Sequence, residues 1–209
     1  MKAIIFDFDG VILDSVNVKT KAFESLYEKY GRDIQNKVVK YHLEHGGISR
    51  FEKFKYYHKN FLQQNLSESE LIHLGNQFSE LVFKKVCSSK FIPGALEFLK
   101  FCNQKYLTFI CTGTPFSEIV NILNEIRLNK YFNHVFGSPM SKTEIILKIL
   151  KTYNLSFKEV LFIGDAMTDY DAAKELNIDF IGIENEDTNF PDGTTLVKNL
   201  TEIIKLKFL

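Results

Sequence analysis

The stretch IIFDFDGVILDS (residues 4–15) lies almost at the start of the chain and places two acids after an apolar run. Asp7 follows the run directly, Asp9 comes two positions later, and Gly10 is next. A short, continuous apolar run of this kind is typical of a strand buried on both faces, as in a parallel sheet. Because alternate residues of a strand point the same way, Asp7 and Asp9 can serve one pocket.

Similar apolar runs recur along the second half of the chain. Each is about strand length and rich in Ile, Phe and Val; the runs are YLTFIC (106–111), HVFG (134–137), EVLFI (159–163) and DFIGI (179–183). Residues between them carry helix signals. Thr114 is a candidate N-cap with Pro115 at the first helical position, and Ser141 and Glu144 have capping-box spacing, which puts Lys142 in a first helical turn. This alternation predicts a doubly wound α/β core.

Residues 15–90 break the alternation, because they contain no clear strand and look helical throughout. The segment 15–31 is amphipathic and ends at a glycine, and the segment 67–86 opens with a capping-box pair. Gly46 and Gly47 form a flexible joint beside Arg50. We therefore expect an α/β core made of residues 1–14 and 91–209, with an all-helical cap domain at 15–90.

Composition limits the class of protein. Among 209 residues, Lys plus Arg and Asp plus Glu are both 26, so the net charge is zero, which argues against a strongly basic nucleic-acid or membrane-surface binder. The three cysteines lack metal-ligand spacing and suit a reducing compartment. No apolar run approaches the length of a membrane span. These features predict a cytoplasmic protein with no nucleic-acid or membrane partner, as a monomer or small homo-oligomer.

Chemistry-bearing residues gather at the strand ends. In a parallel α/β sheet, ligands bind outside the carboxyl ends of the strands. The residues there, together with the lysine at a helix start, are Asp7, Asp9, Gly10, Thr112, Gly113, Lys142, Gly164, Asp165 and Asp169. Carboxylate oxygens and water molecules are suitable ligands for Mg²⁺, and a carboxylate can also act as a nucleophile. An ammonium, a hydroxyl and backbone N–H groups can neutralise the charge of a transferring phosphoryl group.

At these positions the chain resembles the haloacid dehalogenase superfamily, in particular its phosphoglycolate-phosphatase-like branch with a helical cap. The resemblance rests on DFDGVILD (7–14), Thr112, Lys142 and GDAMTD (164–169), which occur in the family's order. It implies a Rossmann-like core and a Mg²⁺-dependent phosphatase, a phosphoric monoester hydrolase. The helical cap favours a small phosphorylated metabolite over a phosphoprotein.

The resemblance also implies a role for each residue. Asp7 would attack phosphorus and form an aspartyl-phosphate, while Asp9 would act as acid and then as base. Thr112 and Gly113, with Gly10, would bind the phosphoryl group, and Lys142 would neutralise charge. The metal ligands would be Asp7, the backbone carbonyl of Asp9 and Asp165, with Asp169 completing the cluster. Gly47 and Arg50 of the cap are candidate substrate-specificity residues.

Several alternatives stay open at this level. Asp9 and Gly10 alone also fit a turn that ends a strand, and Thr112 alone fits a plain turn residue. A phosphomutase acting on a sugar phosphate would use the same two acids, and a catalytically silent binding module would keep the same fold. Haloalkanoate dehalogenation would need no second acid such as Asp9.

Overall fold

The computed structural model describes residues 1–205 and has a six-stranded parallel sheet at its centre. The strand order is β3-β2-β1-β4-β5-β6, the doubly wound Rossmann-like order. The strands are β1 (Ala3–Phe6), β2 (Leu107–Pro115), β3 (His134–Ser138), β4 (Val160–Gly164), β5 (Asp179–Ile183) and β6 (Leu196–Val197). The predicted α/β fold with a parallel sheet is confirmed. The two-residue strand β6 was not predicted, because so short a run has no readable pattern.

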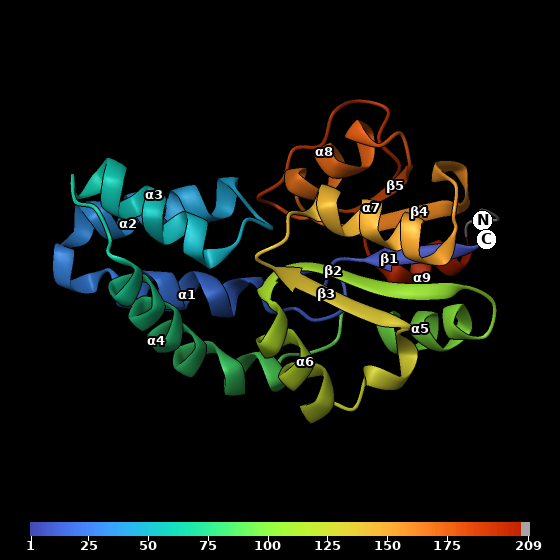
Figure 1. Ribbon diagram of the computed structural model, residues 1–209, viewed down its shortest axis with the longest axis horizontal. Coiled ribbons are helices and arrows are strands. Elements are labelled where there is room, and N and C mark those ends of the chain that lie inside the picture. Colours follow the sequence, from blue (N-terminus) through green and yellow to red (C-terminus); the bar gives the residue numbers. More distant parts are fainter. Residues whose placement is uncertain (206–209) are drawn as a thin grey trace.

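Helices cover both faces of the sheet, and the alternation along β1 explains how. Ile4 and Phe6 pack into one apolar cluster, whereas Ala3 and Ile5 pack into the other. The first cluster includes side chains of α5 (Ala95–Asn103), α6 (Phe116–Glu125) and α9 (Leu200–Lys205). The second includes side chains of α7 (Lys142–Tyr153) and α8 (Met167–Glu175). Figure 1 shows α7 and α8 on one side of the strands and α5 and α6 on the other.

The helix starts follow local sequence chemistry. The capping box of Ser141 and Glu144 is present, and α7 begins at Lys142 as predicted. The start of α6 differs from the prediction, since Pro115 is its N-cap rather than its first residue. Pro115 still belongs to β2, where it pairs with Ser138 of β3 after a register shift. Within residues 1–205 there are also three short 3₁₀ helices, at Glu28–Tyr30, Asn129–Tyr131 and Phe157–Glu159.

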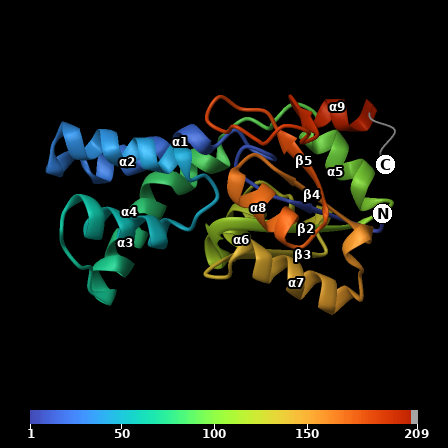
Figure 2. The ribbon, with the colours of Figure 1, turned by 90° about the horizontal axis from the view of Figure 1, so that it is seen from above.

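Four helices lie between β1 and α5 in the chain and form a helical insertion (residues 15–90). They are α1 (Val16–Leu26), α2 (Arg32–Glu44), α3 (Arg50–Phe61) and α4 (Glu68–Cys87). Figures 1 and 2 show them beside the sheet rather than on either of its faces. An aromatic cluster holds them together: the ring of Phe23 lies 4.5 Å from that of Phe78 and 5.6 Å from that of Phe54, centroid to centroid.

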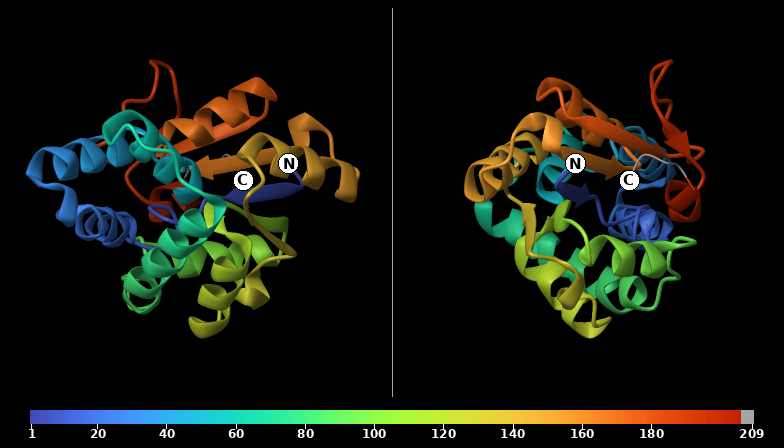
Figure 3. Two further views of the ribbon diagram at one scale, coloured as in Figure 1. Left: turned by 60° about the vertical axis from the view of Figure 1, so that its left-hand side comes forward. Right: turned by 90° about the vertical axis from the view of Figure 1, so that its right-hand side faces the viewer.

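The helical insertion faces the carboxyl ends of the strands. The chain start lies at the opposite end of the sheet from the helical insertion (Figures 1 and 3), and every paired strand runs parallel to β1 or its neighbours. No helix within residues 1–205 is long and apolar enough to cross a membrane. The edge of the sheet where ligands are expected is therefore the edge that the insertion helices approach.

Candidate active site

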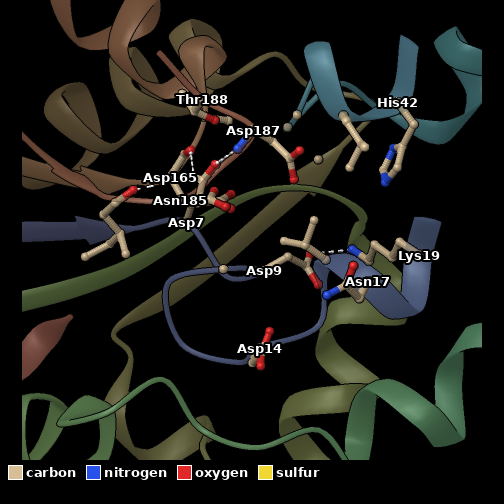
Figure 4. A pocket seen from close by; sticks show the side chains of 18 of the residues that line it. Asp7, Asp9, Asp14, Asn17, Lys19, His42, Asp165, Asn185, Asp187 and Thr188 are labelled. Atoms are coloured by element: carbon tan, nitrogen blue, oxygen red, sulfur yellow. Dashed lines mark hydrogen bonds and ion pairs between the residues drawn. The ribbon is translucent and has the colours of Figure 1, made fainter. Parts of the chain in front are cut away.

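A cavity of about 470 Å³ lies between the carboxyl edge of the sheet and the helical insertion. Its floor includes Asp7, Thr112 and Asp165, and its opposite wall comes from α1, α2 and α3. Figure 4 shows the carboxylates of Asp7 and Asp165 side by side, with His42 across the cavity. The enclosed position means that charges here interact in a medium of lower dielectric than water.

Three carboxylates meet at the cavity floor. Asp7 follows β1, Asp165 follows β4, and Asp169 lies in the first turn of α8, and one carboxylate oxygen of each lies within 4.8 Å of the other two. The strand ends bring Asp7 and Asp165 together because β1 and β4 are neighbours in the sheet. Gly10 has φ +82°, and a Cβ there would approach Asp165 Oδ2 to 2.0 Å. A side chain at position 10 would therefore displace Asp165.

Lys142 is the cation of this cluster. Its Nζ lies 2.5 Å from Asp169 Oδ1 and 3.2 Å from Asp7 Oδ1, and the side chain is 7% exposed. Asp169 Oδ2 also accepts a hydrogen bond from the Ala166 N–H, at 3.1 Å. Asp169 therefore orients Lys142 as well as standing beside the other two carboxylates.

One ammonium does not balance three clustered carboxylates, of which Asp7 and Asp169 are buried and Asp165 is half-buried. Burial, against the opposing pull of Lys142, raises the pKa of Asp7 to about 7, and Asp169 and Asp9 add to the increase. Burial, followed by the charges of Asp7 and Asp169, raises the pKa of Asp165 well above its ordinary value. Among the described residues, Asp7 Oδ1 has the Lys142 ammonium as an ion-pair partner and no hydrogen bond of good geometry. Three carboxylate oxygen donors whose negative charge exceeds the positive charge around them fit a hard divalent cation such as Mg²⁺.

The Asp9 side chain points away from this cluster, because the chain turns directly after Asp7. Its Oδ1 accepts a hydrogen bond from Ser15 Oγ at 2.6 Å, and its Oδ2 forms an ion pair with Lys19 and a 3.2 Å contact with Thr114 Oγ1. Burial raises the pKa of Asp9, but Lys19, Ser15 and Thr114 outweigh it and lower the pKa below its ordinary value. Asp9 therefore lines the same cavity as Asp7, as expected, although its carboxylate is not among the clustered ligands.

Thr112 and Gly113 lie at the end region of β2, on the cavity wall. Thr112 is 1% exposed, and its Oγ1 accepts a hydrogen bond from the Thr114 N–H at 3.2 Å. The hydroxyl hydrogen of Thr112 is therefore free to donate into the cavity.

Gly47 of the helical insertion touches the sheet edge. Its φ is +77°, and a Cβ there would lie 2.1 Å from Thr168 Oγ1 and 2.5 Å from Lys142 Nζ. Its carbonyl oxygen lies so close to Gly113 that a Cβ on Gly113 would come within 2.3 Å. Thr168 Oγ1 also donates to the Gly46 carbonyl at 2.8 Å. The Gly46-Gly47 joint thus rests directly on the predicted phosphate-binding residues.

Arg50 lines the cavity, but its guanidinium group is already paired. Nη1 donates to Glu118 Oε2 at 2.9 Å and to Ser79 Oγ at 2.9 Å, while Nη2 pairs with Glu118 Oε1. Arg50 and Glu118 are 4% and 7% exposed, so this is a buried ion pair between the helical insertion and α6. In this structure Arg50 joins the insertion to the sheet domain, and its predicted contact with a substrate stays a prediction.

Sequence reasoning assigned no site role to four residues of this region: Lys19, His42 and Lys53 line the cavity, and Ser15 donates a hydrogen bond to Asp9 beside it. Ser15 and Lys19 are four positions apart at the start of α1, so helical periodicity alone could have placed them on one face. His42 and Lys53 lie on different helices, and no local pattern pairs them.

The sheet order, the insertion after β1 and the carboxylate cluster together define the class: an α/β enzyme whose site suits phosphoryl chemistry. The model of the haloacid dehalogenase-like hydrolase family matches residues 4–183. The match covers most of the chain, and the protein belongs to this family, as the sequence motifs predicted.

Individual relatives give finer comparisons. A phosphorylated carbohydrates phosphatase of Thermotoga maritima is 28% identical over 193 residues, covering 87% of this chain and 84% of that protein. The β-phosphoglucomutase of Clostridium difficile superposes with a TM-score of 0.79 at 24% identity, over 100% of this chain and 94% of the other. The putative hydrolase YfnB of Bacillus subtilis, solved bound to magnesium, has a TM-score of 0.73 at 18% identity, over 100% and 99%. The two structures establish the fold, and the family and its named phosphatase support the predicted enzyme class, a phosphoric monoester hydrolase.

Proposed function

We propose that the protein is a Mg²⁺-dependent phosphatase of a small phosphorylated metabolite and that Asp7 carries the phosphoryl group during turnover. The observation that carries the proposal is the position of Asp7: it is buried at the cavity floor, and the Lys142 ammonium lies 3.2 Å from its Oδ1. The described relatives include a phosphatase, and YfnB was solved with magnesium, which support the same assignment.

The proposed metal site consists of Asp7 and Asp165, with Asp169 beside them and the backbone carbonyl of Asp9 as a further oxygen donor. Bound there, Mg²⁺ would supply positive charge that screens the anionic phosphate from the anionic nucleophile. The acids fit this task, because their raised pKa values reflect burial first and then the negative charge of neighbouring carboxylates that the protein alone does not neutralise.

The first step is attack by Asp7 on phosphorus. The new bond joins a carboxylate oxygen of Asp7 to phosphorus, and the bond from phosphorus to the substrate oxygen breaks. Asp9, in its protonated form, gives its proton to that leaving oxygen. Thr112 donates its hydroxyl hydrogen to a phosphoryl oxygen, backbone N–H groups at Gly113 do the same, and Lys142 offsets the charge of the group.

The second step returns Asp7 to its starting state. Water attacks phosphorus, its proton passes to Asp9, and the bond between phosphorus and Asp7 breaks to release phosphate. Lys19 lowers the Asp9 pKa, so it favours the ionised form that this step requires and opposes the protonated form that the first step requires. Lys19 is therefore a positioning residue that tunes the base.

We also propose that residues 15–90 act as a cap over a catalytic core of residues 1–14 and 91–209. The contacts of Gly47 with the sheet edge and the ion pair of Arg50 with Glu118 support a closed arrangement. Closure would exclude bulk water from the cavity while the phosphoryl group is transferred.

The test is release of free phosphate from a panel of phosphorylated sugars, sugar acids, nucleotides and an aryl phosphate, with Mg²⁺ and with EDTA. We expect Mg²⁺-dependent release that Asp7→Asn abolishes. Interconversion of sugar-phosphate isomers without release would instead identify a phosphomutase. No turnover of any compound, or equal turnover by Asp7→Asn, would identify a binding module and contradict the proposal.

A further inference from the structure

A lysine and a histidine lie together at the helical-insertion end of the cavity, far from any sequence motif. Lys53 comes from α3 and His42 from α2, and both line the cavity although they are only 2% and 7% exposed. Lys53 Nζ donates to His42 Nδ1 at 2.7 Å and to the His42 carbonyl oxygen at 3.2 Å. Figure 4 shows His42 on the side of the cavity opposite Asp7 and Asp165.

Lys53 has no carboxylate partner within residues 1–205. The other two basic side chains of this wall are paired, Lys19 with Asp9 and Arg50 with Glu118. Burial lowers the pKa of Lys53 well below its ordinary value, and the ammonium groups of Lys19 and Lys142 lower it further. The Phe23 ring lies 5.7 Å from Nζ, near the limit of about 6 Å for a cation–π contact. Such a contact returns less than the cost of burying an ammonium, so the ring does not replace a counter-ion.

His42 leaves a second group without a partner. An ammonium can only donate, so when Lys53 is charged Nδ1 accepts from it and the hydrogen of the neutral imidazole lies on Nε2. His42 Nε2 is buried and has no hydrogen-bond partner among the described residues. Burial, then the charges of Lys53 and Lys19, lower the His42 pKa, which favours this neutral form. Buried donors without partners are rare in folded proteins and point to a missing acceptor.

We propose that Lys53 and His42 bind a second anionic group of the substrate, at the end of the cavity away from the phosphate. The inference rests on the proposed phosphatase function and narrows its substrate class to phosphate monoesters that carry a further carboxylate or phosphate. The second anion supplies the counter-ion that Lys53 lacks and an acceptor for the Nε2–H of His42. The cavity of about 470 Å³ limits such a substrate to a small molecule.

The test compares pairs of substrates that differ by one anion. Phosphoglycerate against glycerol phosphate tests a carboxylate, and glucose bisphosphate against glucose monophosphate tests a second phosphate. We expect the protein to prefer the anionic member of one pair in kcat/KM, and Lys53→Met to lower that preference about ten- to hundredfold, as for loss of one hydrogen bond to a charged group. The pair that responds identifies the anion.

Lys55→Met is the matched control, because Lys55 lies on the same helix but is exposed, pairs with Glu52 and does not line the cavity. It should leave the preference unchanged. If Lys53→Met does not fold, His42→Gln tests the same site through the Nε2 donor. An unchanged preference in Lys53→Met and His42→Gln, or no preference in the parent protein, would overturn the inference.

A binding measurement tests this inference independently of the proposed phosphatase function. Calorimetry of phosphoglycerate and of glucose bisphosphate on Asp7→Asn needs no turnover. Tighter binding of an anionic compound than of its partner, lost when Lys53→Met is added, supports the second-anion site even if no phosphate is released in the activity panel. Equal binding with and without Lys53→Met contradicts the inference even if the protein proves to be a phosphatase.

Discussion

Asp7 and Asp9 are two positions apart, yet their environments predict opposite effects of the same substitution on stability. Without a metal ion, Asp7→Asn should stabilise the protein at pH 8, whereas Asp9→Asn should destabilise it. Asp7 is buried beside two further carboxylates, and Lys142 keeps Asp169 as a partner when Asp7 is neutralised. Asp9 instead forms an ion pair with Lys19, which the substitution would remove.

The size of the stability change expected for Asp7→Asn follows from the pKa of Asp7. An increase from 3.8 to about 7 corresponds to about 4 kcal/mol. The folded protein keeps this proton up to about pH 7 while the unfolded chain loses it near pH 4, so Asp7 makes stability fall between those values and imposes its full cost above pH 7. A buried Asn amide without a partner costs about 1–3 kcal/mol. The expected net gain of Asp7→Asn is therefore about 1–3 kcal/mol above pH 7, and it becomes a net loss of about 1–3 kcal/mol near pH 4, where only the cost of the buried amide remains.

Asp9 has the opposite effect on stability, because its pKa in the folded protein lies below its ordinary value. Ionised Asp9 stabilises the folded protein above the pKa of the unfolded chain, and this stabilisation is lost as the pH falls through the pKa of the folded protein. Loss of a charge-assisted hydrogen bond at this partly buried position should lower stability by about 1.5–3 kcal/mol at pH 8.

The assay is urea unfolding followed by far-UV circular dichroism, in EDTA, at several pH values. Added Mg²⁺ should stabilise the parent protein and reverse the order of parent and Asp7→Asn, because the ion favours ionised Asp7. If Asp7→Asn is less stable than the parent at pH 8 in EDTA, the description of an uncompensated buried carboxylate is wrong.

Three further predictions concern the helical insertion and the metal. Glu118→Gln should lower the free energy of unfolding by about 3–5 kcal/mol, since it leaves buried Arg50 without its ion-pair partner. The midpoint of urea unfolding measures this change, and an unchanged midpoint would refute the prediction. Gly47→Ala should lower kcat/KM at least about tenfold, because the added methyl group would push the Gly46-Gly47 joint away from Thr168. The free energy of unfolding should fall by only about 1–2 kcal/mol. A variant with the same kcat/KM as the parent protein would contradict the proposal that the cap closes through this contact. Removal of Mg²⁺ with EDTA should abolish phosphate release, and Ca²⁺ should restore it poorly because it takes more ligands at longer distances; full activity in EDTA would contradict the metal assignment.

The main strands and several helices could be predicted from the sequence because their signals are local. Continuous apolar runs gave β1, β2, β4 and β5 to within about two residues, apart from the longer C-terminal end of β2, and the capping box of Ser141 and Glu144 gave the start of α7. The position of Asp165 beside Asp7 followed from the rule that parallel strand ends meet at one edge.

The remaining features depend on contacts between distant residues. The turn after Asp7 sends Asp9 toward Lys19, and only the packing of α1 against the sheet edge decides that pairing. Glu118 is 68 positions from Arg50, so no local pattern indicated that the guanidinium group was already paired. The contact of Lys53 with His42 likewise joins two helices whose relative placement the sequence does not specify.

The central claim is that Asp7 carries the phosphoryl group during turnover, and chemical trapping tests it most directly. The protein is mixed with substrate and Mg²⁺, quenched in denaturant with borohydride, which reduces an acyl phosphate to an alcohol, and digested for peptide mass spectrometry. We predict homoserine at position 7, in the peptide that contains residues 4–15, and none when Mg²⁺ is left out. Reduction at Asp9 or another acid instead, or no reduced residue during steady phosphate release, would contradict the account.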